Sequence, residues 1–246
     1  MDGIAAIREG QGDEIVLVHG GASPATTWGP LMPMGAHWSL TILHRRGYPP
    51  SPDPPDGRQD FERDATDLAP FLESRPHVVA HSYGVLGTLI AAASRPHLVR
   101  SLTLIEPPAY LESDDPEVMW LQRLGDEVLR HGLDADPAML REFLHVAGAP
   151  GVDAGPLPAE VAGGVRRAHG ARLPSEAGPD LDALRAAAIP TLVASGDHSP
   201  AIERFCDSLG EALAGQRLVA PGAGHFVAAA PGFPARLERF LLAATD

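Results

Sequence analysis

Six short apolar runs recur along the chain, and their spacing constrains the fold more than any other feature of the sequence. They occupy residues 14–19, 38–44, 77–81, 99–106, 190–195 and 216–220. Segments with apolar residues at helical spacing lie between and after several of them, over 57–74, 83–96, 199–213 and 231–245. Apolar strands that alternate with helices indicate a parallel sheet covered on both faces. The sequence therefore predicts an α/β fold with a mostly parallel central sheet.

Residues 107–189 break this alternation, because they contain no convincing strand. Apolar residues recur at helical spacing over 116–132 and 137–148, and two further helical pieces follow around 158–170 and 179–188. The Gly/Pro-rich stretch 148–160 separates the two pairs. We therefore expect a core formed by residues 1–106 and 190–246, with residues 107–189 inserted into it as a helical cap.

The third apolar run ends at a serine between small residues, in the order Ala80-His81-Ser82-Tyr83-Gly84. A nucleophilic serine on a tight strand-to-helix turn requires small residues two positions before and after it, because the strand and helix backbones crowd there. The same pentapeptide also fits a serine that only caps the following helix. The pentapeptide alone leaves both interpretations open.

Two other segments favour a nucleophile. The first strong run leads into His19-Gly20-Gly21, and the backbone N–H groups of Gly21 and Tyr83 could stabilise a developing oxyanion. The alternative for this segment is a flexible turn. His225 lies in the loop after the sixth run and comes last in the order Ser, acid, His, as a catalytic base would. The alternative for His225 is a solvent-facing loop histidine.

With these segments in place, the chain resembles the α/β-hydrolase family over nearly its whole length. The resemblance rests on HGG with a following tryptophan, AHSYG, LIEPP, SGDHSP and GAGHF, together with the helical insertion. It implies a Ser–His–acid triad under a helical cap. The family's usual acid stands three residues after the glycine that follows the fifth run, where this chain has Ser199. We prefer Glu106 as the acid, at the position used by haloalkane dehalogenases and zearalenone lactonases; the alternatives are Asp197 and no triad acid.

These residues predict a serine hydrolase that cleaves a small to medium-sized, fairly apolar carboxylic ester or lactone through an acyl-enzyme at Ser82. A cofactor-independent carbon–carbon hydrolase or oxygenase with His225 as base is an alternative on the same fold, as is a non-catalytic ligand receptor. Trp28, Trp120 and Phe143 are candidate substrate contacts. For the two aromatic residues of the insertion, packing inside the cap is the competing interpretation.

Charge and composition narrow the range of partners. Lys and Arg total 19 against 32 Asp and Glu, and the net charge of −13 disfavours nucleic acid and anionic membranes. No metal-ligand spacing and no phosphate or dinucleotide loop stands out, so we expect neither a metal nor a cofactor. The N-terminal residues lack the pattern of a secretory signal, and no apolar run approaches the ~20 residues of a membrane span. We expect a cytoplasmic monomer or homodimer with a small-molecule substrate.

Overall fold

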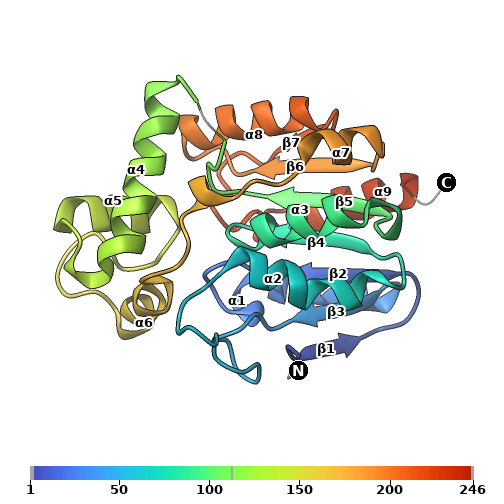
Figure 1. The fold of residues 1–246 in the computed structure, drawn as a ribbon, viewed down its shortest axis with the longest axis horizontal. Helices are drawn as coiled ribbons and strands as arrows, with labels where there is room; N and C mark the ends of the chain where they lie inside the picture. The colour runs from blue at the N-terminus through green and yellow to red at the C-terminus, as the bar shows by residue number, and fades with distance from the viewer. Residues whose placement is uncertain (1–2, 112, 245–246) are drawn as a thin grey trace.

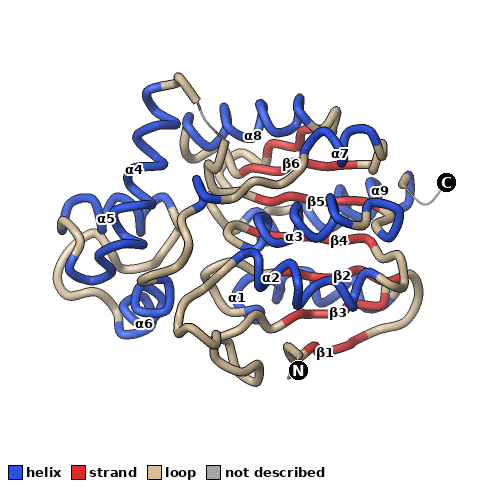
Figure 2. The backbone as a smooth tube through the Cα atoms, viewed as in Figure 1, coloured by secondary structure: helices blue, strands red, loops and turns tan. Residues whose placement is uncertain are grey.

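A seven-stranded sheet runs through the protein in the computed structural model, which describes residues 3–111 and 113–244 (Figures 1 and 2). The first strand in the sheet order is antiparallel to its neighbour, and the other pairs are parallel. In spatial order the strands are β1 (Ala6–Glu9), β3 (Ser39–Leu43), β2 (Glu14–Val18), β4 (His77–His81), β5 (Ser101–Ile105), β6 (Thr191–Ser195) and β7 (Gln216–Val219).

The α/β fold predicted from the sequence is confirmed, and each of the six apolar runs forms a strand. The edge strand β1 was not predicted. All four of its residues are exposed, so its sequence carries no apolar pattern to mark it. An edge strand of this kind is held by backbone hydrogen bonds to β3, which any sequence without proline can make.

Helices cover both faces of the sheet, because successive strand residues point to opposite sides. In β4, Val78 and Ala80 pack in the hydrophobic cluster of one face, whereas Val79 packs in that of the other. The first face is covered by α2 (Phe61–Leu68), α3 (Gly84–Ser94), α7 (Leu181–Ala186) and α8 (Pro200–Ala212). The second is covered by α1 (Pro24–Trp28), the 3₁₀ helix η1 (Gly29–Ala36), the 3₁₀ helix η6 (Val227–Ala229) and α9 (Phe233–Ala243).

Three helices between β5 and β6 lie beyond the carboxyl ends of the central strands: α4 (Pro116–His131), α5 (Pro137–Val146) and α6 (Ala159–Ala168) (Figure 1). An aspartate followed by proline starts each of the first two. The carboxylates of Asp115 and Asp136 accept hydrogen bonds from backbone N–H groups of the first turn, and the proline occupies a position that needs no N–H donor.

These three helices share a small hydrophobic core of their own, which contains Val128, Leu140 and Val165. In contrast, α7 packs against α3 and α8, and its Leu184 belongs to the core of the sheet. The cap boundaries at residues 107 and 189 stay a prediction, and within them α7 lies with the helices of the core. In the described part of the chain, no helix combines the length and the hydropathy needed to cross a lipid bilayer.

Candidate active site

Ser82 occupies a sharp turn between β4 and α3. Its φ angle is +52°, a left-handed value that is uncommon for residues other than glycine and that marks a strained turn. Its backbone N–H donates to the Ile105 carbonyl at 2.9 Å. A Cβ atom at Gly84 would lie 2.4 Å from the His19 carbonyl oxygen, so only glycine fits there. The small residues around Ser82 thus have the steric cause that the sequence suggested.

The glycine turn after β2 packs directly against Ser82. A Cβ atom at Gly20 would lie 2.6 Å from Ser82 Cβ and 3.2 Å from its Oγ, which again excludes a side chain. Within the described residues, neither the Gly21 nor the Tyr83 backbone N–H has a hydrogen-bond acceptor. Both donors therefore remain available to a group bound at Ser82.

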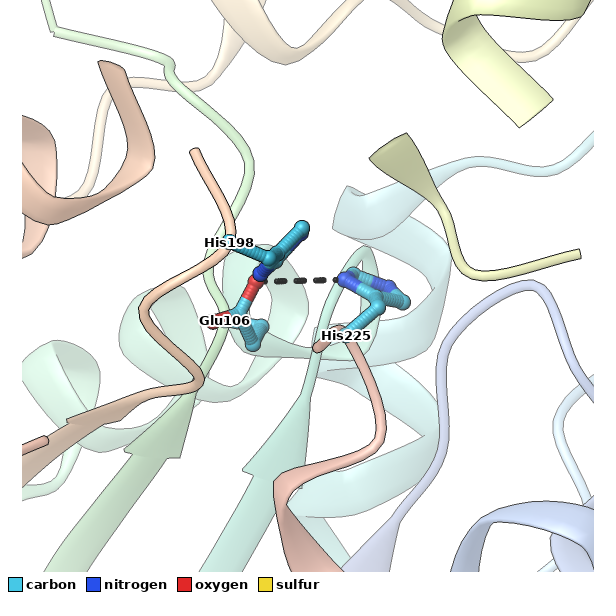
Figure 3. A group of neighbouring side chains, drawn as sticks. All are labelled: Glu106, His198 and His225. Carbon is cyan, nitrogen blue, oxygen red and sulfur yellow. Dashed lines mark hydrogen bonds and ion pairs between the residues drawn. The ribbon is translucent and has the colours of Figure 1, made fainter. Parts of the chain in front are cut away.

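Glu106 and His225 meet at the carboxyl ends of β5 and β7. Glu106 has a φ angle of +49° and is 1% exposed. Its Oε1 accepts a hydrogen bond from the Gly196 N–H at 2.7 Å, and its Oε2 lies 3.3 Å from His225 Nδ1. Figure 3 shows this carboxylate directed at His225. Asp197, in contrast, is exposed, and its backbone N–H donates to Glu203. The structure brings Glu106, and not Asp197, to His225.

Burial sets the protonation of this pair. Burial, with a smaller effect of the nearby His198, lowers the pKa of His225 to about 3. At neutral pH the imidazole is therefore uncharged. Its Nδ1–H donates to Glu106 Oε2, which leaves Nε2 as the acceptor that a general base needs. Burial raises the pKa of Glu106 to about 7, against the lowering effects of His198 and of the Gly196 N–H.

His81, the residue before Ser82, contacts His225. His81 Nε2 donates to the His225 carbonyl at 2.9 Å, and the two rings lie 4.6 Å apart between centroids. Among the described residues no hydrogen bond joins Ser82 Oγ to His225 itself. Catalytic hydrogen bonds are often long in ligand-free enzymes and tighten when substrate binds. The Ser82–His225 contact therefore stays a prediction.

His198 belongs to this site although the sequence analysis did not select it. Its Nε2 donates to the Val146 carbonyl at 3.0 Å and lies 3.8 Å from Glu106 Oε2 (Figure 3). It lies in the SGDHSP segment, between Asp197 and Ser199. Its position after a strand end was the signal that could have found it.

The same three side chains are the grouping in the described structure that most resembles a metal site. Ligand-type atoms of Glu106, His198 and His225 all lie within 4.8 Å of one another. However, His198 Nε2 is used as a donor to Val146, and His225 Nδ1 as a donor to Glu106. Metal ligation requires a free lone pair, and His198 keeps one only on Nδ1, which has no hydrogen-bond partner among the described residues. The Glu106–His225 hydrogen bond favours an acid–histidine pair over a metal centre.

The predicted substrate contacts lie in different places. Trp28 is 1% exposed and belongs to the core cluster of the second sheet face, with its ring 6.3 Å from that of His81. Trp120 is 39% exposed and donates to Glu142. Phe143 packs against the core of the cap. For these two cap residues, the described part of the chain shows no hydrogen bond and no ring contact with Ser82, Glu106 or His225.

The Glu106→Gln variant is expected to gain stability relative to the wild type as the pH rises. The pKa of Glu106 rises from an ordinary value of 4.5 to about 7 on folding, so the folded protein binds more protons than the unfolded chain in this interval. The free energy of unfolding therefore falls as the pH rises from 4.5 to 7. At about 1.4 kcal/mol for each pKa unit, the loss is roughly 3 kcal/mol.

The Glu106→Gln variant escapes this loss because it is uncharged and keeps an oxygen for the Gly196 N–H. Urea unfolding at pH 4 and pH 8 measures the effect, since both pH values lie outside the interval. The variant should gain roughly 3 kcal/mol relative to the wild type between these two pH values. If the free energies of unfolding of the two proteins differ by the same amount at pH 4 and at pH 8, the raised pKa of Glu106 is contradicted.

Comparison with known proteins gives a consistent picture. The sequence model described as "Alpha/beta hydrolase family" matches residues 15–237. A probable lysophospholipase, BODYGUARD 2 of Arabidopsis thaliana, is 30% identical over 109 residues, which are 40% of this chain and 23% of that protein. The chain thus matches less than a quarter of the length of this relative.

Solved structures match over nearly the whole chain. A bacterial membrane phospholipase A superposes with a TM-score of 0.71 at 20% identity, covering 99% of this chain and 83% of the other. A thermophilic esterase from Thermogutta terrifontis superposes with a TM-score of 0.69 at 20% identity, covering 99% and 94%. At these identities the likeness shows a shared fold.

Proposed function

Because the chain belongs to the alpha/beta hydrolase family, we propose that it is a serine hydrolase that cleaves a carboxylic ester or lactone with Ser82, His225 and Glu106. The observation that carries the proposal is the contact between His225 Nδ1 and Glu106 Oε2 at 3.3 Å, at the same end of the sheet as the strained Ser82 turn. A buried carboxylate on one imidazole nitrogen fixes the tautomer and leaves the other nitrogen basic.

The proposed reaction has two halves. His225 Nε2 takes the proton of Ser82 as Oγ attacks the substrate carbonyl, and the N–H groups of Gly21 and Tyr83 stabilise the oxyanion. The imidazolium, stabilised by Glu106, returns the proton to the leaving alcohol, and an acyl-enzyme remains. Water, activated by the same imidazole, then attacks this ester, and Ser82 is released with the carboxylic acid.

The cap favours a small to medium-sized, fairly apolar substrate. A Cβ atom at Gly148, in the loop after α5, would lie 3.2 Å from His225 Cβ, so the cap passes directly over the proposed base. The net charge of −13 also disfavours an anionic substrate at long range. The relatives whose names contain esterase or phospholipase support carboxylic esters as the substrate class.

A fluorophosphonate and a series of p-nitrophenyl esters test this proposal together. We expect turnover that is highest for short to medium acyl chains, and loss of activity when the phosphonate reacts. Peptide mass spectrometry should then place a single adduct on Ser82. Turnover that survives complete labelling of Ser82, or an adduct on another residue, would reject the proposed mechanism.

A further inference from the structure

Arg45 is a buried cation that the proposed triad leaves without a role. Its side chain is 3% exposed, and its Nη2 lies 2.6 Å from Oδ2 of Asp64, which is 7% exposed. Burial of two charges carries a large desolvation penalty that their attraction does not reliably offset. The Arg45–Asp64 ion pair is therefore weak evidence that Arg45 stabilises the fold. The other groups that the guanidinium binds indicate its role.

Those groups belong to the glycine turn beside Ser82. Arg45 Nη1 donates to the Gly20 carbonyl at 2.9 Å, while Nη2 also donates to Gln59 Oε1 at 2.9 Å. The planar guanidinium thus spans Asp64, Gln59 and the turn at once. This use of several donors in fixed directions is available to arginine and not to lysine.

His19 also binds the Gly20 carbonyl. Its Nδ1 lies 3.0 Å from the Gly20 oxygen and 2.8 Å from that of Ala22, and its Nε2 accepts the Arg45 backbone N–H at 3.1 Å. These partners require the Nδ1–H tautomer. Burial and the charge of Arg45 keep the pKa of His19 well below its ordinary value, so the ring is neutral and keeps this tautomer.

We propose that Arg45 is a positioning residue that orients and polarises the oxyanion hole. The peptide group between Gly20 and Gly21 is planar and trans, so its carbonyl and its N–H point in opposite directions. A carbonyl fixed on Arg45 therefore turns the Gly21 N–H away from Arg45. The cation also polarises this peptide group, which strengthens its N–H as a donor.

Two further contacts tie Arg45 to the same donors. The guanidinium carbon lies 5.1 Å from the ring centroid of Tyr83, whose backbone supplies the second proposed N–H. It also lies 6.0 Å from the ring of Tyr48, whose hydroxyl donates to the Gly21 carbonyl at 2.8 Å. The carbonyls on both sides of the Gly21 N–H are therefore fixed. The inference rests on the proposed serine hydrolase function.

The substitution Arg45→Lys tests it, because lysine keeps the charge beside Asp64 but cannot hold Gly20 and Gln59 as well. Loss of an oxyanion donor costs about 10²–10³-fold in kcat, and we expect a decrease of about 10²-fold here. KM for a p-nitrophenyl ester should change less than about threefold, because ground-state binding does not use the hole. A boronic acid, which forms an anionic tetrahedral adduct on Ser82, should lose affinity by the same factor as kcat/KM.

Arg46→Lys is the matched control. Arg46 lies next in the chain and is ion-paired with Asp67 at 2.6 Å, so the same change there should leave kcat within about twofold. Thermal unfolding monitors the folded fraction of each variant. If Arg45→Lys does not fold, Asp64→Asn replaces it: it removes the anion that anchors the guanidinium, and kcat should again fall with little change in KM.

Folded Arg45→Lys with wild-type kcat and wild-type boronic acid affinity would overturn the inference. The same holds for a variant whose KM rises while kcat is unchanged, because that result would place Arg45 in ground-state binding. If Ser82→Ala retains wild-type turnover, the proposed function fails, and this inference fails with it. The Ser82 result therefore separates the two failures.

Discussion

Replacing Ser82 with alanine should lower ester turnover by about 10³-fold or more. The variant keeps the glycine turn, the N–H groups of Gly21 and Tyr83, and the Glu106–His225 pair. It loses only the atom that forms the acyl-enzyme. Residual turnover would come from binding and from the oxyanion donors acting on water.

The effect is expected on kcat and not on folding. Ser82 makes no side-chain hydrogen bond within the described residues, and its positive φ angle is less strained for a small residue than for a bulky or β-branched one. Steady-state kinetics with a p-nitrophenyl ester and thermal unfolding on the same preparation separate the two effects.

Ser199→Ala provides a matched control. Ser199 stands where the family's usual acid is expected and precedes α8, but its side chain makes no capping hydrogen bond. This change should leave turnover within about twofold of the wild type. A Ser82→Ala protein that turns over as fast as Ser199→Ala would exclude a serine nucleophile, and would leave a base-only reaction by His225 or no catalysis by this site.

Much of the fold could be predicted because it depends on local pattern. A β-branched apolar run forms a strand, and small residues two positions before and after Ser82 permit the tight turn; each signal lies within a few residues. Two elements were missed. β1 is an exposed edge strand without an apolar pattern, and α1 is only five residues long, although Ser23 and Pro24 form an N-cap and a first helical residue.

The site was harder to predict because its contacts join distant segments. His198 is 92 residues from Glu106 in the chain, and the Arg45–Gly20 bond depends on how the loops after β2 and β3 meet. The sequence around these residues does not indicate which loops lie next to each other in the fold. The sequence ranks Glu106 above Asp197 only through the resemblance to the family. The packing of Gly196 against Gly224, where a Cβ would lie 2.0 Å from a carbonyl oxygen, explains why the loop after β6 passes close to the histidine loop.

Replacing Glu106 with glutamine should lower kcat by about 10²–10⁴-fold. Glutamine keeps the size of the side chain and an oxygen for the Gly196 N–H, but it cannot stabilise the imidazolium that forms when His225 takes the proton of Ser82. The amide NH₂ could also face Nδ1 and favour the wrong tautomer of His225. Steady-state kinetics at pH 8 measure the loss.

The choice of pH matters for this variant. At pH 8 the carboxylate of the wild type is ionised, because this pH lies above the pKa of about 7 for Glu106. Urea unfolding at the same pH gives the folded fraction of each protein. A loss of kcat in a variant that is fully folded at pH 8 can then be assigned to the reaction and not to unfolding.

Asp197→Asn is the matched comparison, since it makes the same chemical change at the competing acid. Asp197 is exposed and has a φ angle of +56°, a conformation that asparagine also tolerates. Its contact with Glu203 uses the backbone N–H, which the substitution retains. We expect kcat within about twofold of the wild type and a change in stability of about 1 kcal/mol or less.

The reverse result, an inactive Asp197→Asn beside an active Glu106→Gln, would require the loop after β6 to bring Asp197 to His225 during the reaction. If both variants stay within a few-fold of the wild type, Ser82 and His225 act without a fixed acid. We expect an inactive Glu106→Gln beside an active Asp197→Asn. Oε2 of Glu106 already lies 3.3 Å from His225 Nδ1, and the Glu106 side chain is fully buried. To act as the acid, the Asp197 side chain would have to move from solvent into the buried position that Glu106 occupies. If both carboxylates were buried side by side, each would raise the pKa of the other.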